Sequence, residues 1–294
     1  MTDARTLTIA LGGKWHRRYG AAPCPVCQSS RRKDQNALTL ADGRNGRLVL
    51  DCKKSACAFL DILAAAGVRS GDYTPPDAAT LAQREREAKA EAQHKAAQAK
   101  RLWDEAQPIA GTAAEAYLRG RRITCELPRT LRFYGACWHG PTARRYPAMV
   151  AAVQGAGLPA VHRTWLRPDG SGKADIAPAK AMLGATAGGA VRLADGLGRL
   201  VVVEGIESGL SLLCGLLDGP ATLWAGLSTS GLRGLHLPSQ AGRLTIACDG
   251  DRPGREAAHA LAERAHALGW QTGILDPGDG ADFNDILAGK AVAA

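Results

Sequence analysis

The sequence predicts a multidomain protein of mixed α/β and α+β class, and its 294 residues suffice for two or three small domains. Three features support this prediction: four closely spaced cysteines near the N-terminus, a long polar helical stretch, and alternating strands and helices in the C-terminal third. We expect four parts, namely a cysteine-rich module at 1–72, a linker helix at 73–106, a small α+β unit at 107–195 and an α/β unit at 196–294.

The first part of the chain combines short strand-like runs with turns. Residues 38–40 and 48–50 are apolar runs that predict a two-stranded ribbon, and residues 61–67 predict a short helix. Pro75 and Pro76 then break the pattern, because proline lacks the backbone N–H that helices and strands use. We therefore expect a small, loop-rich module before these prolines.

A long helix is predicted next. From Ala78 to Ala106 the sequence is rich in Ala, Glu, Lys, Gln and Arg, which all have high helix propensity. Asp77 is a good N-cap for it. Because the helix is polar on all sides, we expect a solvated connector, and a contact surface for a partner is the alternative.

The predicted order of strands and helices changes near residue 200. Before it, three strand-like runs separated by turns predict a small α+β unit, at 131–134, 148–153 and 158–165. After it, strands and helices alternate, with strands at 200–203, 221–225, 243–248 and 272–275 and helices at 206–217, 253–268 and 282–287. Such alternation predicts a parallel sheet flanked by helices.

Charge is unevenly distributed along the chain, which carries a net charge of +9. Residues 1–72 hold 12 Lys and Arg against 6 Asp and Glu, and residues 106–195 hold 12 against 5. Residues 196–294 hold 7 against 11. The two basic segments favour a polyanionic partner such as nucleic acid, and the acidic segment suits a site for divalent cations.

Several classes of protein are disfavoured. No apolar run approaches the roughly 18–20 residues that a membrane span needs, so we expect no membrane partner. The segment from Met1 to Leu11 lacks the pattern of a signal peptide, and we expect a cytoplasmic protein. In a reducing compartment, closely spaced cysteines bind metal more often than they form disulfides.

Four cysteines have the spacing of a zinc site. Cys24 and Cys27 form a CxxC pair, and Cys52 and Cys57 follow after 24 residues. Zinc prefers four such ligands in a tetrahedron, and a site with four protein ligands is structural because no position is open for substrate. His16 is an alternative ligand, and a reduced thiol cluster without metal is the other alternative.

Basic and aromatic residues surround these cysteines in the sequence. The basic ones that we expect to contact DNA are Arg17, Arg18, Arg31, Arg32, Lys33, Lys53 and Lys54, and the aromatic ones are Trp15, Tyr19 and Phe59. Cations suit the phosphates of single-stranded DNA, and aromatic faces suit its bases. A basic zinc ribbon that binds protein is the alternative.

Three carboxylates follow two predicted strands. Glu204 ends the run Val201–Val203, and Asp249 and Asp251 end the run Thr245–Cys248. In open α/β sheets, ligands bind at the carboxyl ends of the strands. Converging carboxylates repel each other unless cations neutralise them, and oxygen ligands select Mg²⁺ or Mn²⁺. The pattern therefore predicts a metal site for phosphoryl chemistry, with two solvated strand ends as the alternative.

These motifs resemble a known family. Val203-Glu204-Gly205 and the segment Asp249–Ala258, which begins Asp-Gly-Asp-Arg-Pro-Gly, resemble the Toprim domain of DnaG-type primases and topoisomerases. The closing Asp282–Leu287 is similar to the tail of the primase branch, often seen in phage and plasmid primases. More loosely, Tyr117–Gly120 and residues 131–133 resemble the start of the primase polymerase core, and the cysteine module resembles the primase zinc-binding domain.

The resemblance implies roles for individual residues. Glu204 would act as the catalytic acid/base or metal-organising group, and Asp249 and Asp251 would hold Mg²⁺ or Mn²⁺. Four basic residues would meet triphosphate or template, namely Lys173, Lys180, Arg163 and Arg119. Ser208 stands where many Toprim domains carry an acid, and whether Glu207 beside it compensates is left open. Asp279 and Asp282 are candidates for the further acid that some primases use.

The resemblance implies a DNA primase, a DNA-directed nucleotidyltransferase that joins ribonucleoside triphosphates into a short RNA primer on single-stranded DNA. The chain stops soon after Leu287, so a replicative helicase or other replication protein is expected to act in trans. Two alternatives remain: a Toprim-type metal-dependent nuclease, and a non-catalytic DNA-binding accessory protein in replication.

Overall fold

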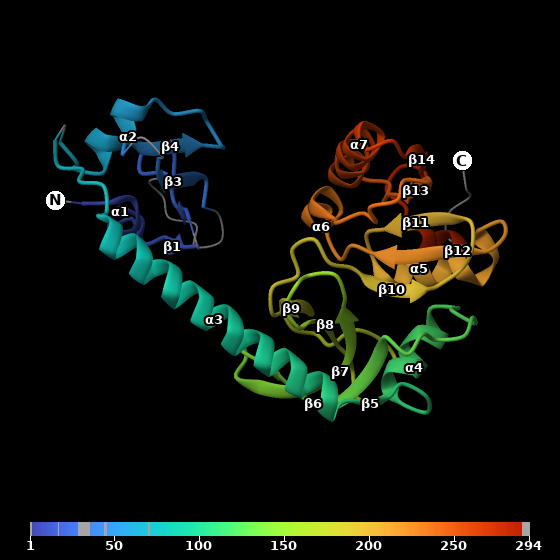
Figure 1. The fold of residues 1–294 in the computed structure, drawn as a ribbon. Coiled ribbons are helices and arrows are strands. Elements are labelled where there is room, and N and C mark those ends of the chain that lie inside the picture. The colour runs from blue at the N-terminus through green and yellow to red at the C-terminus, as the bar shows by residue number, and fades with distance from the viewer. Residues whose placement is uncertain (1, 17, 29–35, 44–45, 70, 290–294) are drawn as a thin grey trace. The chain divides into compact units, whose positions relative to one another are not determined.

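The computed structural model describes residues 2–16, 18–28, 36–43, 46–69 and 71–289. Its contacts divide the chain into two compact units, Met1–Glu91 and Ala92–Ala294. The finer division into four parts stays a prediction. The fold class is confirmed: the chain is mixed α/β and multidomain, with a largely parallel, helix-flanked sheet near its C-terminus (Figure 1). A cluster of four cysteines lies near its N-terminus.

The first unit is built on a four-stranded antiparallel sheet in the order β1-β2-β3-β4. Its elements are α1 (Ala4–Ala10), β1 (Lys14–Trp15), β2 (Gly20–Ala22), β3 (Leu38–Asp42), β4 (Leu48–Cys52) and α2 (Phe59–Ala65). The predicted ribbon corresponds to β3 and β4, whereas α1, β1 and β2 were not predicted. Leu7 of α1, Leu38 and Leu40 of β3 and Ile62 of α2 form its small apolar core.

The linker helix α3 (Ala78–Glu105) is present, but it is not a solvated connector along its whole length. Arg84 pairs with Asp3 and with Asp42, so the beginning of α3 is tied to the first unit. Near the other end, Ala99 is buried and the Arg132 guanidinium lies 4.3 Å from the centre of the Trp103 ring. Each end is therefore packed within its own unit.

The second unit contains two five-stranded sheets. The first is antiparallel, in the order β5-β6-β7-β8-β9, and comprises β5 (Gln107–Pro108), β6 (Leu131–His139), β7 (Arg144–Val153), β8 (Ala160–Trp165) and β9 (Lys180–Leu183). Helix α4 (Ala113–Gly120) precedes β6. Successive side chains of a strand point to opposite faces of its sheet, so neighbouring residues of β8 and of β9 lie on different sides of this sheet.

The second sheet has the order β10-β12-β11-β13-β14, and all of its pairs are parallel except β10 with β12. Its strands are β10 (Val191–Ala194), β11 (Arg199–Val203), β12 (Ala221–Ala225), β13 (Arg243–Ala247) and β14 (Gln271–Leu275). Its helical segments are α5 (Ile206–Ser211), η1 (Leu212–Leu216), α6 (Thr229–Gly234), α7 (Arg252–Ala267) and α8 (Phe283–Leu287). The parallel sheet predicted from the strand–helix alternation is thus present, with an antiparallel edge strand added.

One predicted helix is interrupted. The sequence predicts a helix over 206–217, but α5 ends at Ser211 and the chain continues through the short π-helical segment η1. Gly215 has a φ of +106°, which other residues rarely adopt, so the helix cannot continue through this position.

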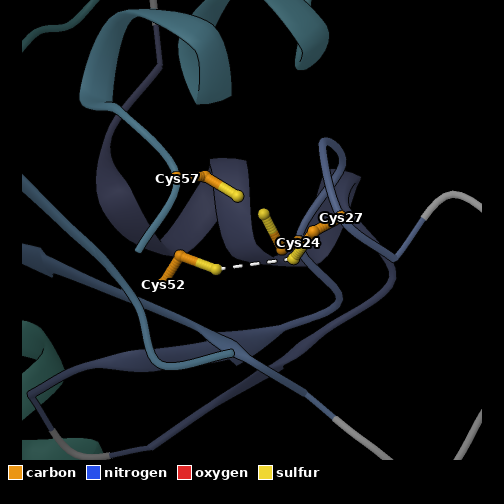
Figure 2. Close-up of side chains that lie close together, drawn as sticks. All are labelled: Cys24, Cys27, Cys52 and Cys57. Carbon is orange, nitrogen blue, oxygen red and sulfur yellow. Dashed lines mark hydrogen bonds between the residues drawn. The ribbon is translucent and has the colours of Figure 1, made fainter. Parts of the chain in front are cut away.

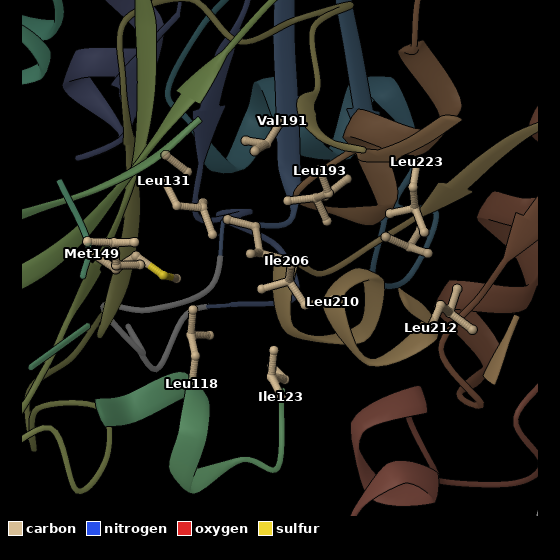
Figure 3. Close-up of a cluster of buried hydrophobic side chains, with 14 of the residues drawn as sticks. Leu118, Ile123, Leu131, Met149, Val191, Leu193, Ile206, Leu210, Leu212 and Leu223 are labelled. Atoms are coloured by element: carbon tan, nitrogen blue, oxygen red, sulfur yellow. The ribbon is translucent and has the colours of Figure 1, made fainter. Parts of the chain in front are cut away.

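A shared apolar core joins the two sheets of the second unit (Figure 3). Leu131 and Met149 come from the antiparallel sheet, Leu223 comes from the parallel sheet, and Ile206 and Leu210 of α5 lie between them. The other face of the parallel sheet packs against α7 in a second core. Because both faces are covered, the strand ends are the accessible edge of this sheet. None of the helices in the described parts of the chain has the length and apolar character to cross a bilayer.

The closing helix α8 is attached to this core by a buried polar residue. Asn284 donates hydrogen bonds of 2.9 Å to the backbone oxygen of Arg121 and to Oγ of Ser211. We expect Asn284→Ala to lower the free energy of unfolding by about 1–3 kcal/mol, because both acceptors lose a buried donor. Urea denaturation followed by circular dichroism measures this. The exposed Gln271→Ala is the control, with an expected change below about 0.5 kcal/mol; equal losses in the two variants would contradict the assignment.

Candidate active site and metal centre

The four cysteines converge in the first unit. Their Sγ atoms all lie within 4.8 Å of one another, and the Sγ atoms of Cys27 and Cys52 are 3.5 Å apart (Figure 2). Cys52 ends β4, and Cys57 follows one turn later, just before α2. Tetrahedral zinc with Zn–S bonds of about 2.3 Å needs sulfurs about 3.8 Å apart, so the cluster has the dimensions of a zinc site.

Gln28 connects the first cysteine pair to the sheet. Its Oε1 accepts hydrogen bonds of 2.9 Å from the backbone N–H groups of Cys24 and Ala37. Ala37 directly precedes β3, and β3 pairs with β4, which carries Cys52. This buried glutamine therefore aligns the two halves of the cluster, and the sequence contains no spacing rule that would have identified it.

The thiols differ in acidity. Burial alone would raise the pKa of Cys52, but the backbone N–H groups of Ser55, Cys57 and Lys54 lower it to about 6. Burial and the neighbouring thiols raise the pKa of Cys57 to about 12. A bound cation lets all four sulfurs ionise together, because it offsets their mutual repulsion. The donor set therefore fits zinc.

The predicted DNA contacts around this cluster are described in part. Arg18, Lys53 and Lys54 are exposed, as are the rings of Tyr19 and Phe59. Trp15 is only half-exposed, with Arg84 over its ring. Arg17, Arg31, Arg32 and Lys33 lie outside the described residues. DNA binding by this surface stays a prediction.

The predicted carboxylates meet at the carboxyl edge of the parallel sheet. Strands β11 and β13 pair in register, with Val203 opposite Ala247, so Glu204 and Asp249 both emerge just beyond the ends of neighbouring strands. Asp251 is the N-cap of α7, where its Oδ1 accepts a 2.7 Å hydrogen bond from the N–H of Gly254. Asp251 thus caps a helix, a structural role that its spacing from Asp249 in the sequence did not predict.

Burial and mutual repulsion make two of these acids weak. Burial, with the negative charges of Asp249 and Asp251, raises the pKa of Glu204 to about 7. Burial, with Asp282 and Asp251, raises the pKa of Asp249 to about 6. Oδ1 of Asp249 is buried and has no hydrogen-bond partner among the described residues. A buried, unpartnered oxygen between repelling acids is the environment that a hard cation stabilises, so these residues fit Mg²⁺ or Mn²⁺.

The acids do not, however, form a compact ligand set like that of the thiols. Within the described residues, the four cysteines are the one group of three or more side chains close enough to share a metal. Asp251 is engaged at its helix cap, where it accepts the N–H of Gly254. Asp282 lies close enough to raise the pKa of Asp249, whereas Asp279 is 94% exposed and pairs with Arg255 at 2.7 Å.

A close backbone approach holds the loop before α8 against this edge. The N–H of Gly250 donates to the backbone oxygen of Ala281, and the N–H of Gly280 donates to the backbone oxygen of Gly250. A Cβ at position 250 would collide with the carbonyl oxygen of Gly278. The glycine between the two aspartates is therefore required by packing, and it brings Asp282 toward Asp249.

Both predicted lysines pair with an acid in the first turn of α5, the helix that follows β11. Lys173 and Lys180 each place Nζ 3.4 Å from a carboxylate oxygen of the buried Glu207. The positive charge of Lys180 also counteracts the raised pKa of Glu204 and of Asp249. The structure therefore brings Lys173 and Lys180 together next to the carboxyl edge of the parallel sheet.

The two predicted arginines lie elsewhere. Lys180 pairs with Thr164 across β8 and β9, so Arg163, one residue earlier, faces the opposite side of the sheet. Its guanidinium stacks 4.9 Å from the centre of the Trp165 ring. Arg119 donates to Glu115 and to the backbone oxygens of Ile123 and Cys125. Nucleotide contact by Arg163 and Arg119 stays untested, and their geometry here is that of packing residues.

Comparison with family models identifies both parts of the second unit. Residues 93–193 match a domain of unknown function, DUF7146, and residues 199–292 match the Toprim domain model. Residues 199–292 form a Toprim domain. This confirms the Toprim resemblance that Glu204-Gly205 and Asp249-Gly250-Asp251 suggested. A search of curated proteins found no match.

Solved structures with similarity to the chain include three primase fragments. A DNA primase domain from Pseudomonas aeruginosa is 18% identical, with 67% of this chain and 75% of that chain covered and a TM-score of 0.42. The RNA polymerase domain of Mycobacterium tuberculosis primase DnaG is 15% identical, with 67% and 78% covered and a TM-score of 0.40. The zinc-binding and RNA polymerase domains of Aquifex aeolicus primase are 11% identical, with 94% and 77% covered and a TM-score of 0.42.

The cysteine cluster generates a prediction about metal content. We expect about one zinc per chain, and we expect Cys24→Ser to lose it and to unfold the first unit, whose apolar core is small. Elemental analysis and limited proteolysis measure the two effects. Cys214→Ser, which alters a thiol outside the cluster, is the control and should retain the zinc. Unchanged zinc content in Cys24→Ser would rule out a site of four cysteines.

The Toprim carboxylates generate a prediction about pH. The folded-state pKa values of Glu204 and Asp249 are raised from 4.5 to about 7 and from 3.8 to about 6. Their contribution to stability is therefore present in acid and is lost as pH rises through these values, unless a cation binds the ionised groups. We expect Mg²⁺ to raise Tm at about pH 8 and to have little effect at about pH 5, where protons compete with it.

Variants test this pH dependence. In Asp249→Asn the Mg²⁺-dependent shift of Tm at about pH 8 should largely disappear, because the buried oxygen no longer carries charge. Asp218→Asn, an exposed acid in the same domain, should keep the shift. Differential scanning fluorimetry measures it, and a shift of equal size at both pH values would contradict the proposed link.

Proposed function

We propose that this protein is a DnaG-type DNA primase, which joins ribonucleotides into a short RNA primer on a single-stranded DNA template. The observation that carries the proposal is the carboxyl edge of the Toprim sheet. There, Lys180 acts on the weakly acidic Glu204 and Asp249, and Lys180 and Lys173 both contact Glu207 in the helix that follows Glu204. Acids that hold a divalent cation beside lysines that meet phosphate suit nucleotidyl transfer.

The proposed reaction is attack by a ribose 3′-hydroxyl on the α-phosphate of an incoming ribonucleoside triphosphate, with pyrophosphate as the leaving group. Divalent cations supply charge neutralisation on the phosphates when they are bound. Asp249 and Asp251 would hold them. Glu204 has a pKa of about 7, so its carboxylate is suited to take the proton of the attacking hydroxyl near neutral pH. Lys173 and Lys180 would neutralise charge on the triphosphate.

The first unit would provide template recognition. Its exposed Arg18, Lys53 and Lys54 lie near a cluster that fits zinc, with Tyr19 and Phe59 available for stacking on bases. Zinc would then act structurally, since all four of its ligands come from the chain. A helicase or another replication protein is proposed as a partner in trans.

Primer synthesis tests the proposal directly. Zinc-loaded wild-type protein should make dinucleotides and longer RNA on single-stranded DNA templates of varied sequence with Mg²⁺ or Mn²⁺. Asp249→Ala should lower the rate by at least about 100-fold, because the cation loses its buried ligand. Asp218→Asn, an exposed acid at the opposite, amino-terminal edge of the same sheet, should stay within about twofold.

The same experiment separates the alternatives. Labelled template DNA in the reaction reports cleavage, and metal-dependent cleavage without synthesis would identify a nuclease. If the protein binds DNA, makes no product and supports replication equally well as Asp249→Ala, it is a non-catalytic accessory protein. Either result would overturn the primase proposal.

A further inference from the structure

Glu207 is a buried acid in the second unit with three charged or polar partners. It belongs to the first turn of α5, three residues after Glu204, and only 7% of its side chain is exposed. Its Oε1 accepts a 2.7 Å hydrogen bond from the hydroxyl of Tyr117 and lies 3.4 Å from Nζ of Lys173. Its Oε2 lies 3.4 Å from Nζ of Lys180. One carboxylate thus connects three separate segments.

We propose that Glu207 is a positioning residue, whose buried carboxylate holds Lys173 and Lys180 at the carboxyl edge of the Toprim sheet so that both ammonium groups face the phosphates of the nucleotide. The kinetic part of this inference rests on the proposed function. The holding of the two lysines does not, because it can be measured without any activity.

The lysines need such a holder because of where they come from. Lys173 lies in the loop between β8 and β9, and Lys180 begins β9, an edge strand of the antiparallel sheet. Lysine side chains are long and flexible, and two ammonium groups at one site repel each other. A carboxylate between them offsets this repulsion and restricts both chains, which prepares the site before a ligand arrives.

The partners of Glu207 keep its carboxylate ionised. Burial alone would raise the pKa of Glu207, but Lys180, Lys173 and the Tyr117 hydroxyl outweigh it and keep the pKa well below its usual range. Burial and the charge of Glu207 raise the pKa of Tyr117, so its hydroxyl remains a donor. The carboxylate is therefore ionised at every pH at which the protein would work.

The charge balance leaves the cluster positive. Two lysines against one glutamate leave one unbalanced positive charge. His162, on the neighbouring strand, is buried, and burial lowers its pKa to about 4, so it adds no charge near neutral pH. Within this cluster Lys180 acts on Glu204 and Asp249, where its charge partly offsets the rise in their pKa values that burial and neighbouring acids cause. An anionic triphosphate between the lysines and the cation-binding acids is the ligand that this arrangement suits.

Lysine acylation tests the holding of the lysines. Wild-type protein and Glu207→Gln are treated with an acetylating reagent, and each lysine's rate is followed by mass spectrometry. Gln keeps the size of the side chain but removes its charge, so the rates at Lys173 and Lys180 should rise at least about threefold, because neither ammonium group is held by a carboxylate any longer. Unchanged rates at both lysines would overturn the inference, whether or not the protein is a primase.

A matched control is available on α7. Glu256 also pairs with two basic residues, Arg252 at 2.8 Å and Arg233 at 3.6 Å, but it is exposed and lies on another face of the domain. Glu256→Gln should leave the acylation rates of Lys173 and Lys180 unchanged. Increased rates in this control would mean that general loosening, not the loss of Glu207, frees the lysines, and would overturn the inference.

Steady-state primer synthesis tests the role toward nucleotide. In Glu207→Gln, KM for ribonucleoside triphosphates should rise about tenfold or more, with a smaller change in kcat, because the lysines no longer meet the phosphates in a fixed geometry. Glu207→Asp keeps the charge and should recover part of the loss. An unchanged KM in Glu207→Gln would refute the positioning of nucleotide, and a lower KM would show that Glu207 masks the lysines instead.

The outcomes remain separable if a variant is unstable or the wild type is inactive. If Glu207→Gln does not fold, Glu207→Asp provides both measurements, with a smaller rise expected in acylation rate and in KM. If wild-type protein makes no primer, the proposed function fails, and acylation still decides whether Glu207 holds the lysines. If acylation changes but KM does not, the positioning of nucleotide is refuted while the contact is confirmed.

Discussion

The parallel pairing of β11 with β13 determines where chemistry can occur in the second unit. These strands run in register from Arg199 opposite Arg243 to Val203 opposite Ala247, so their carboxyl ends reach the same edge. Apolar cores cover both faces of the sheet, which leaves this edge as the place for polar side chains. Glu204 and Asp249 emerge there, and the pairing of Gly250 with the loop before α8 brings Asp282 to the same edge.

Acidic and basic side chains together then determine how readily the acids at this edge ionise. Acids close together in a half-buried position resist ionisation, as the raised pKa values of Glu204 and Asp249 indicate. Lys180 reduces that resistance, and Glu207 holds Lys180 by an ion pair. The antiparallel sheet supplies Lys180, the Toprim domain supplies the acids, and the shared core fixes one against the other. The proposed site therefore depends on packing between two sheets rather than on the Toprim domain alone.

The first unit has a different source of stability. Its apolar core is small, and the sulfur cluster lies beside it, with Gln28 aligning the two cysteine pairs. In a module of this size a bound metal supplies cross-links that apolar burial cannot. In the proposed function, the exposed cations and rings near the cluster would serve recognition, because none of them is needed in the core.

Local sequence patterns determined the cysteine quartet, the strand–helix alternation and the strand-end carboxylates, because each is a matter of residue type and spacing within a short window. They therefore predicted the fold class and the placement of Glu204 and Asp249 at strand ends, whereas Lys173 and Lys180 were predicted from the resemblance to a known family. Only the tertiary structure decided which contacts these side chains make. The sheet register turned Arg163 away from Lys180, and packing of α4, α5 and β9 enclosed Glu207 between two lysines and Tyr117, which lies 90 residues away in the chain. Such contacts depend on how distant segments pack, and no local periodicity encodes them.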